Sequence, residues 1–231
     1  MPTNAFLTGE YLQRIPHWHT GDSAWKARGI LRMLERNRLA PQRIGEVGCG
    51  TGEVLRQLQD GMARDCTFVG YDIAPEAIQL SLHRQNERLL CRLGDATAAP
   101  GDTFDLVLML DVLEHQENYF QFLRDVKPLA TYKLIHTVLD LSVQSVARKH
   151  VLTRCRRNLS DLHFFTKELV FEALRGEGYE IVDWCYEFPR RYQAKGVADT
   201  VLQLPRRLCF AVNQDFAVRV LGGHSLFVLA T

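Results

Sequence analysis

The stretch RIGEVGCGTG, residues 43–52, decides the fold of this chain. A short apolar strand leads into glycines at alternate positions, Gly48, Gly50 and Gly52, and a helical pattern begins at Glu53. A strand, a glycine turn and a helix in this order let a ligand approach bare backbone at the carboxyl end of the strand. The stretch therefore predicts an open α/β fold with a ligand at this corner.

One carboxylate in the first turn of that helix bears on the kind of ligand. A dinucleotide fingerprint is GxGxxG, and it places a pyrophosphate at the N-terminus of the helix. Here the glycine spacing differs, and Glu53 would set a negative charge beside that phosphate. The sequence therefore favours a ligand that has a cationic centre and no phosphate.

Three further predicted strands are each followed by an acidic residue. They are 66–71 before Asp72, 89–93 before Gly94 and Asp95, and 104–110 before Asp111. The carboxyl ends of parallel strands share one edge of a sheet, so these acids are expected close together. An acid after the second strand is placed to accept both hydroxyls of a ribose.

These motifs resemble those of the class I S-adenosylmethionine-dependent methyltransferases, and most closely the small-molecule methyltransferases of type 11/12. The first motif of that family is an acidic residue, one further residue and then GxGxG, which corresponds here to Glu46 and the three glycines. The family's motif after the fourth strand, roughly DVLEH, corresponds to residues 111–115. The resemblance covers roughly residues 40–188 and the final strand.

The resemblance implies a Rossmann-like, doubly wound α/β sheet of about seven strands, in which an antiparallel last strand lies between the fifth and the sixth. It also implies S-adenosyl-L-methionine as the cofactor, with S-adenosyl-L-homocysteine as the product. The residues that match the family's cofactor contacts are Glu46, Gly48, Cys49, Gly50, Gly52, Asp72, Ile73, Asp95, Ala96, Leu110, Asp111 and His115.

Hydrophobic periodicity places the remaining elements. Helices are expected at 22–38, 53–61, 75–88 and 116–126, with one more from Thr166 or Glu168 to Gly176 or Gly178. The last strands are expected at 132–138, 179–188 and 224–230.

A single domain, 1–231, is expected to carry additions to this core. They are an N-terminal helical lid at 1–39 before the cofactor-binding half at 40–138, and substrate-side inserts at 139–165 and 189–221. One interpretation of the lid is that its aromatic and histidine side chains cover the ligand. The favoured one is that the tryptophans pack onto the core, with Lys26 or Arg28 reaching the cofactor carboxylate. The aromatic and histidine side chains of the lid are Tyr11, His17, Trp18, His19 and Trp25.

Both inserts are basic, whereas residues 44–117 hold thirteen acids against five arginines. One interpretation is that the basic segments are solvated surface. The other is that they bind an anionic acceptor, such as a carboxylate, a phosphate or a sugar derivative, through Arg156 and Arg157, with Asp140 as a further substrate contact.

The implied reaction is an in-line displacement at the sulfonium methyl, which depends mainly on positioning. A hydroxyl acceptor also needs a base, for which His136, near the end of a strand, ranks before His163. Where some methyltransferases carry NPPY or DPPY after the fourth strand, this chain has Asp111 and Val112. The absence of an NPPY or DPPY motif favours an oxygen acceptor over a planar amino group.

The composition agrees with a globular enzyme, with 46% hydrophobic and 24% charged residues among 231. Six cysteines without a CxxC pair or zinc spacing indicate a reduced, cytoplasmic protein that binds no metal. Neither a signal peptide nor an apolar run of membrane-spanning length is recognised.

Alternatives remain open. They are a catalytically silent binding subunit, an N-methyltransferase of RNA or protein, an aminopropyl transferase and an NAD-dependent oxidoreductase. The short basic patch and a pI near 7.7 disfavour a nucleic-acid partner, and a homodimer is left open.

Overall fold

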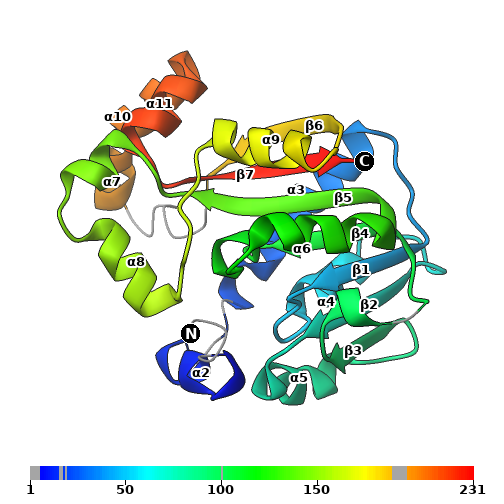
Figure 1. The fold of residues 1–231 in the computed structure, drawn as a ribbon. Coiled ribbons are helices and arrows are strands. Elements are labelled where there is room, and N and C mark those ends of the chain that lie inside the picture. Colours follow the sequence, from blue (N-terminus) through cyan, green and yellow to red (C-terminus); the bar gives the residue numbers. More distant parts are fainter. Residues whose placement is uncertain (1–5, 16–17, 19, 100, 189–196) are drawn as a thin grey trace.

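The computed structural model describes residues 6–15, 18, 20–99, 101–188 and 197–231. They form one seven-stranded sheet in the order β3-β2-β1-β4-β5-β7-β6 (Figure 1). The strands are β1 (Arg43–Val47), β2 (Thr67–Asp72), β3 (Leu89–Leu93), β4 (Phe104–Leu110), β5 (Ala130–Leu139), β6 (Ile181–Glu187) and β7 (His224–Ala230). Strands β1 to β5 pair in parallel, and β7 is antiparallel to both β5 and β6. The predicted sheet and its inserted last strand are confirmed.

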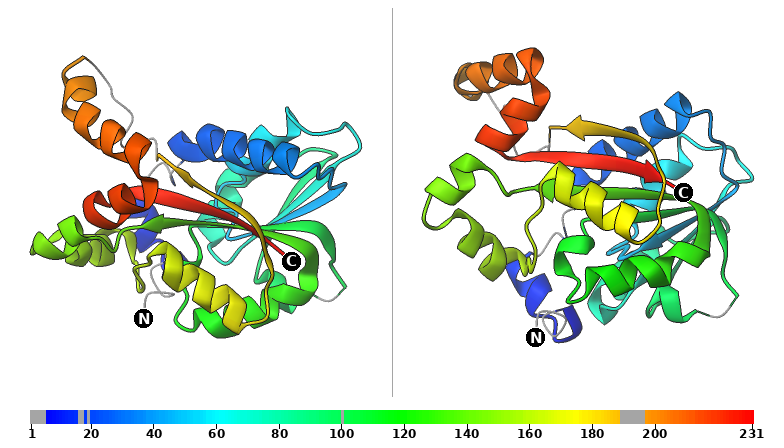
Figure 2. Two further views of the ribbon diagram at one scale, coloured as in Figure 1. Left: turned by 90° about the horizontal axis from the view of Figure 1, so that it is seen from above. Right: turned by 45° about the horizontal axis from the view of Figure 1, so that its top comes forward.

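Helices cover both faces of the sheet (Figure 2). On one face, α3 (Thr20–Arg36) and α4 (Glu53–Gln59) share a hydrophobic core with the sheet, and α5 (Pro75–Ser81) packs at its margin. On the other face, α6 (Tyr119–Val126) and α9 (Lys167–Gly176) share a second core.

The central strand β4 shows how the sheet separates these two cores. Leu106 and Leu108 belong to the core under α3 and α4, whereas Val107 and Met109 belong to the core under α6 and α9. Successive side chains on a strand point to opposite faces, so an uninterrupted apolar run is what a sheet covered on both faces requires.

Three predicted helices are shorter in the structure, and the one predicted over 53–61 ends at Gln59. The segment predicted as a helix over 75–88 leaves α-geometry after Ser81, passes through a 3₁₀ turn at Leu82–Arg84, and bridges Asn86 to Leu89. The helix predicted from residue 116 begins at Tyr119, because the Asn118 side chain accepts a hydrogen bond from the Gln121 backbone N–H at 3.0 Å. Short 3₁₀ turns at Ala96–Ala98, Leu113–His115 and Lys127–Leu129 complete the connections.

The inserts extend beyond the carboxyl end of β5 (Figure 1). The first contains α7 (Val143–Ala147) and α8 (Val151–Leu159), and the second contains α10 (Val197–Val212) and α11 (Gln214–Leu221). The N-terminal segment contains α2 (Glu10–Arg14) before α3, and His17 and His19 lie outside the described residues. All six cysteines are free thiols. Among the described helices, none combines the length and the apolar character needed to cross a bilayer.

Candidate active site at the carboxyl ends of the strands

A cavity of about 540 Å³ lies at the carboxyl ends of β1, β2, β4 and β5. Most residues that the sequence singles out line it, and so do Tyr11, Trp18, Trp25 and Lys26 from the N-terminal segment. The predicted site residues in its wall are Glu46, Gly48, Cys49, Gly50, Asp72, Ile73, Asp95, Ala96, Leu110, Asp111, His115, His136, Asp140 and His163. Gly52, Arg156 and Arg157 lie outside its described lining.

The turn after β1 requires glycine at two positions in this wall. Gly48 has φ +72°, and a Cβ there would lie 2.7 Å from a methyl group of Val112. Gly50 has φ +53°, and a Cβ there would lie 2.5 Å from the Trp18 ring. Because left-handed backbone and close approach both exclude a side chain, this turn keeps its backbone bare toward the cavity.

Asp72 joins the turns after β1 and β2. Its carboxylate accepts hydrogen bonds from the backbone N–H of Gly50 at 2.7 Å and of Ala74 at 2.9 Å. Burial raises the pKa of Asp72, although these backbone bonds oppose the rise. Each carboxylate oxygen has a second lone pair, so Asp72 can still accept hydrogen bonds from a ligand. Asp95 is exposed and caps the next turn through Thr97.

Glu46 is buried at the end of β1, with 2% of its surface exposed. Its Oε2 atom has no hydrogen-bond partner within the described part of the chain. Burial raises the pKa of Glu46 well above its usual value, against the effect of Lys26 nearby. A buried acceptor left unpaired is costly, so this oxygen marks a position for a donor on a ligand.

The structure weakens one argument from the sequence. The Glu53 carboxylate accepts hydrogen bonds from Arg56, Gln57 and Arg84. Burial opposes the change, but these partners together lower the pKa of Glu53. Two arginines compensate its negative charge, so Glu53 would repel a phosphate less than its position in the sequence suggests.

Three charged or polar side chains meet at the opposite wall, a contact that the sequence does not foresee. His136 Nδ1 lies 2.6 Å from Asp111 Oδ1, and Lys26 Nζ lies 2.6 Å from Asp111 Oδ2. Burial would raise the pKa of Asp111, but the Lys26 ammonium and His136 hold it well below its usual value. The His136 Nε2 atom is buried and has no partner among the described residues.

The other two histidines of the cavity bind backbone carbonyls. His163 Nε2 lies 2.9 Å from the Gln116 carbonyl oxygen, which accepts only, so that nitrogen donates. His115 Nδ1 lies 3.3 Å from the Ser160 carbonyl oxygen and 3.6 Å from an Asp161 oxygen. Both rings therefore connect the turn after β4 to the segment after α8.

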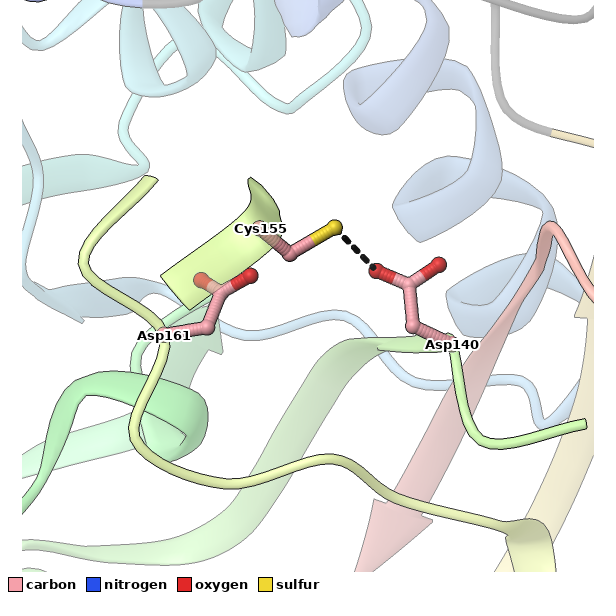
Figure 3. Close-up of side chains that lie close together, drawn as sticks. All are labelled: Asp140, Cys155 and Asp161. Carbon is pink, nitrogen blue, oxygen red and sulfur yellow. Dashed lines mark hydrogen bonds between the residues drawn. The ribbon is translucent and has the colours of Figure 1, made fainter. Parts of the chain in front are cut away.

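Asp140, Cys155 and Asp161 converge from three segments on the same side (Figure 3). Asp140 follows β5, Cys155 lies on α8 and Asp161 follows α8. Their ligand atoms all lie within 4.8 Å of one another, and Cys155 Sγ lies 3.9 Å from Asp140 Oδ2. Two carboxylates and a thiol are donors that a divalent cation such as zinc accepts. The three residues lie between 140 and 161, but their spacing matches no metal-binding motif, so the sequence gives no sign of this cluster.

The described wall is strongly acidic. Nine carboxylate residues line it, and Lys26 is the sole lysine or arginine among its described residues. Arg156 and Arg157 are exposed on α8, where Arg156 donates to the Leu162 carbonyl at 3.4 Å. The basic insert and the acidic cavity are therefore separate features of the surface.

Comparison with known sequences finds a family that matches part of the chain. Residues 46–132 match the Methyltransferase domain family. The chain is also 34% identical, over 89 residues, to a ubiquinone biosynthesis O-methyltransferase from Parvibaculum lavamentivorans. That match spans 36% of this chain and about a third, 34%, of the length of the relative.

Solved structures share the fold. One is magnesium protoporphyrin IX methyltransferase from Synechocystis with bound SAH, with a TM-score of 0.60 and 15% identity over 90% of this chain and 82% of that one. Another is a putative sarcosine dimethylglycine methyltransferase from Galdieria sulphuraria, with a TM-score of 0.63 and 11% identity over 89% and 84%. The chain therefore shares the fold of these methyltransferases, and its residues 46–132 match the methyltransferase domain family.

Proposed function

We propose that this protein binds S-adenosylmethionine in the cavity and transfers its methyl group to an oxygen of a small-molecule acceptor. The observation that carries the proposal is that the bare glycine turn, the orphaned Glu46 oxygen and the His136 Nε2 atom line one cavity. The match of residues 46–132 to the methyltransferase domain family and the similarity to an O-methyltransferase over 89 residues support a methyl transfer of this kind.

The residues present fit this cofactor. Gly48 and Gly50 leave room for close approach, and the Glu46 Oε2 atom offers an acceptor to a cationic or N–H donor. Asp72 retains lone pairs for ribose hydroxyls, and Asp95 stands exposed at the end of β3. The acidic wall attracts a sulfonium and an ammonium group, because opposite charges favour each other most where water is excluded.

The chemistry divides simply between cofactor and protein. When bound, S-adenosylmethionine supplies a methyl group on a positively charged sulfur, and the transfer leaves the C–S electron pair on that sulfur. His136 Nε2 accepts the proton of the acceptor hydroxyl, so the oxygen lone pair is free to bond to carbon. Trp25 and other apolar groups limit water around the reacting atoms.

For the acceptor, the lining favours a neutral or cationic molecule. Besides Glu53, which is paired with Arg56 and Arg84, an anion such as a phosphate or a free carboxylate would meet eight carboxylate residues and a single lysine. The basic residues Arg156 and Arg157 lie away from the described lining, so they support the anionic alternative less than their sequence suggests. Free thiols throughout the chain favour a reducing compartment such as the cytoplasm.

The test is turnover with a panel of acceptors. The protein is incubated with S-adenosylmethionine and neutral phenols, carboxylated phenols or amines, and S-adenosylhomocysteine release is measured by mass spectrometry. We expect release with neutral phenols to exceed release with their carboxylated analogues. Cofactor binding without turnover on any acceptor would instead favour a catalytically silent binding subunit, and preference for amines would favour an N-methyltransferase.

A further inference from the structure

We propose that Lys26 and Asp111 are positioning residues that hold His136 in the tautomer whose Nε2 atom accepts a proton. This inference rests on the proposed function, because it concerns the base of that reaction. The three side chains, called here the Lys26–Asp111–His136 chain, come from α3, the end of β4 and β5.

The hydrogen bonds fix the tautomer. Asp111 Oδ1 lies 2.6 Å from His136 Nδ1, and an ionised carboxylate only accepts, so Nδ1 carries the hydrogen. In a neutral ring the other nitrogen, Nε2, is then a bare acceptor. Asp111 remains ionised because Lys26 Nζ lies 2.6 Å from its second oxygen.

The bare nitrogen is buried beside the cavity. His136 lines the cavity wall, 2% of its surface is exposed, and Nε2 has no partner in the described part of the protein. The ring centroid lies 5.5 Å from that of Trp25 and 4.6 Å from that of Phe227, and these contacts fix the ring plane. Since an unpaired buried acceptor is costly, Nε2 marks the place of an acceptor hydroxyl.

The backbone also holds Asp111 in place. Asp111 has φ +56°, a conformation that few residues other than glycine adopt, and its N–H donates to the His136 carbonyl at 2.9 Å. Backbone strain of this kind persists at functional sites, where surrounding contacts impose it. The side chain and the backbone of Asp111 thus both bind the same histidine.

Other charged groups surround this chain but do not replace it. The charges of Glu46 and Asp22 help to raise the pKa of Lys26, and Glu114 lies near Asp111. Burial raises the pKa of Glu46 and, together with Asp111, that of Glu114. Lys26 and Asp111 form the fully charged pair beside His136.

The first test is Asp111→Asn, which keeps the shape of the side chain but replaces one oxygen by an amide nitrogen. The new N–H₂ group can donate to Nδ1, which favours the opposite tautomer and closes Nε2 to the acceptor proton. We expect kcat to fall by about 100-fold or more while the Kd of S-adenosylmethionine changes less than about threefold. Unchanged kcat would overturn the proposal.

A spectroscopic readout separates positioning from a structural effect. Long-range ¹H–¹⁵N correlation spectra report which ring nitrogen carries the hydrogen, and His136→Gln identifies the His136 signals. We expect the Nδ1–H tautomer in the wild-type protein and the Nε2–H tautomer in Asp111→Asn. An Nε2–H tautomer in the wild-type protein would disprove the assignment. This readout needs no turnover, so it can succeed even if the proposed methyl transfer is refuted.

The lysine is tested by a charge series. Lys26→Met should lower kcat about tenfold, and Lys26→Arg should restore most of it, since the arginine keeps the positive charge beside Asp111. If Lys26→Met instead raises the Kd of S-adenosylmethionine and leaves kcat unchanged, Lys26 binds the cofactor and the positioning role is refuted. If Asp111→Asn fails to fold, the double variant Lys26→Met/Asp111→Asn replaces it in the kinetic and the spectroscopic measurement. The double variant no longer contains an unpaired ammonium group.

A matched control removes another ion pair of the same helix. Asp183 accepts hydrogen bonds from Arg36 and Asn37 at the far end of α3, outside the cavity lining. Asp183→Asn should loosen α3 without touching His136, and we expect kcat within about twofold of wild type. A loss equal to that of Lys26→Met would mean that both act through helix placement, which would overturn the proposal.

Discussion

The two walls of the cavity are built in different ways. One wall, which we propose contacts the cofactor and call the cofactor-side wall, consists of strand ends and turns joined by backbone hydrogen bonds; its members are Glu46, Gly48, Gly50 and Asp72. The other wall, which we propose faces the acceptor and call the acceptor-side wall, is held by contacts between side chains from separate elements. Its members are Lys26, Asp111, His136, Asp140 and Asp161.

This difference determines which wall tolerates amino-acid substitutions. A turn that depends on left-handed glycines and on backbone N–H groups tolerates few substitutions, because most side chains would fill it. The acceptor-side wall is made of side chains on separate elements, so single substitutions can change its chemistry without moving the backbone. We therefore expect binding variants at the first wall and rate variants at the second.

The largest expected effect is on rate, at the acceptor-side wall. His136→Ala removes the only nitrogen that we assign as base, so kcat should fall by about 100- to 10,000-fold. Calorimetry should show the affinity for S-adenosylmethionine within about threefold of wild type. His83→Ala, on an exposed turn after α5, is the matched control. Full activity of the His136 variant would remove the distinction between the walls.

A smaller effect is expected from pH at the cofactor-side wall. Burial raises the pKa of Glu46 well above its usual value, so the carboxyl loses its proton only as pH rises. Its negative charge then favours a cationic ligand, and the affinity for S-adenosylmethionine should rise several-fold across this titration. The variant Glu46→Gln should bind with little dependence on pH. Equal pH dependence in both proteins would show that another group is responsible.

The smallest expected effect is on the stability of the fold, and not on activity. It concerns His224, at the point where β7 meets the second insert. Burial and the charge of Arg206 lower the pKa of His224 to about 4. The folded state therefore resists protonation, and its stability is complete above the unfolded value near 6.5 and is lost as pH falls toward 4. Acidification over this range should lower the free energy of unfolding of the wild-type protein by up to about 2 kcal/mol. The variant His224→Phe should not show this loss. Thermal melts at pH 7 and pH 4.5 measure this, and parallel losses would contradict it.

Sequence reasoning succeeds where the signal is local. The glycine turn and the acids Asp72, Asp95 and Asp111 are each read from one strand and its turn, and their common edge follows from parallel strands. The final strand 224–230 is predicted to the residue because turn glycines precede a short apolar run.

Sequence reasoning fails where the contact is distant. The pairing of Lys26 with Asp111 spans 85 residues, and the cluster of Asp140, Cys155 and Asp161 depends on how α8 places Cys155 beside the residue that follows β5. Charge counting likewise gives the basic insert a role at the site, whereas Arg156 and Arg157 are exposed outside the described lining. No periodicity encodes which face of an insert turns inward.

The most direct measurement is calorimetric titration of S-adenosylmethionine into the wild-type protein, Asp72→Asn and Asp105→Asn. Both carboxylates accept two backbone N–H bonds, but Asp105 binds Gln42 and Arg43 at the other end of the sheet. We predict one site in the wild-type protein, unchanged affinity in Asp105→Asn, and more than tenfold weaker binding in Asp72→Asn, about 1.4 kcal/mol or more. No binding to the wild-type protein, or equal affinity in all three, would contradict the assignment of this cavity.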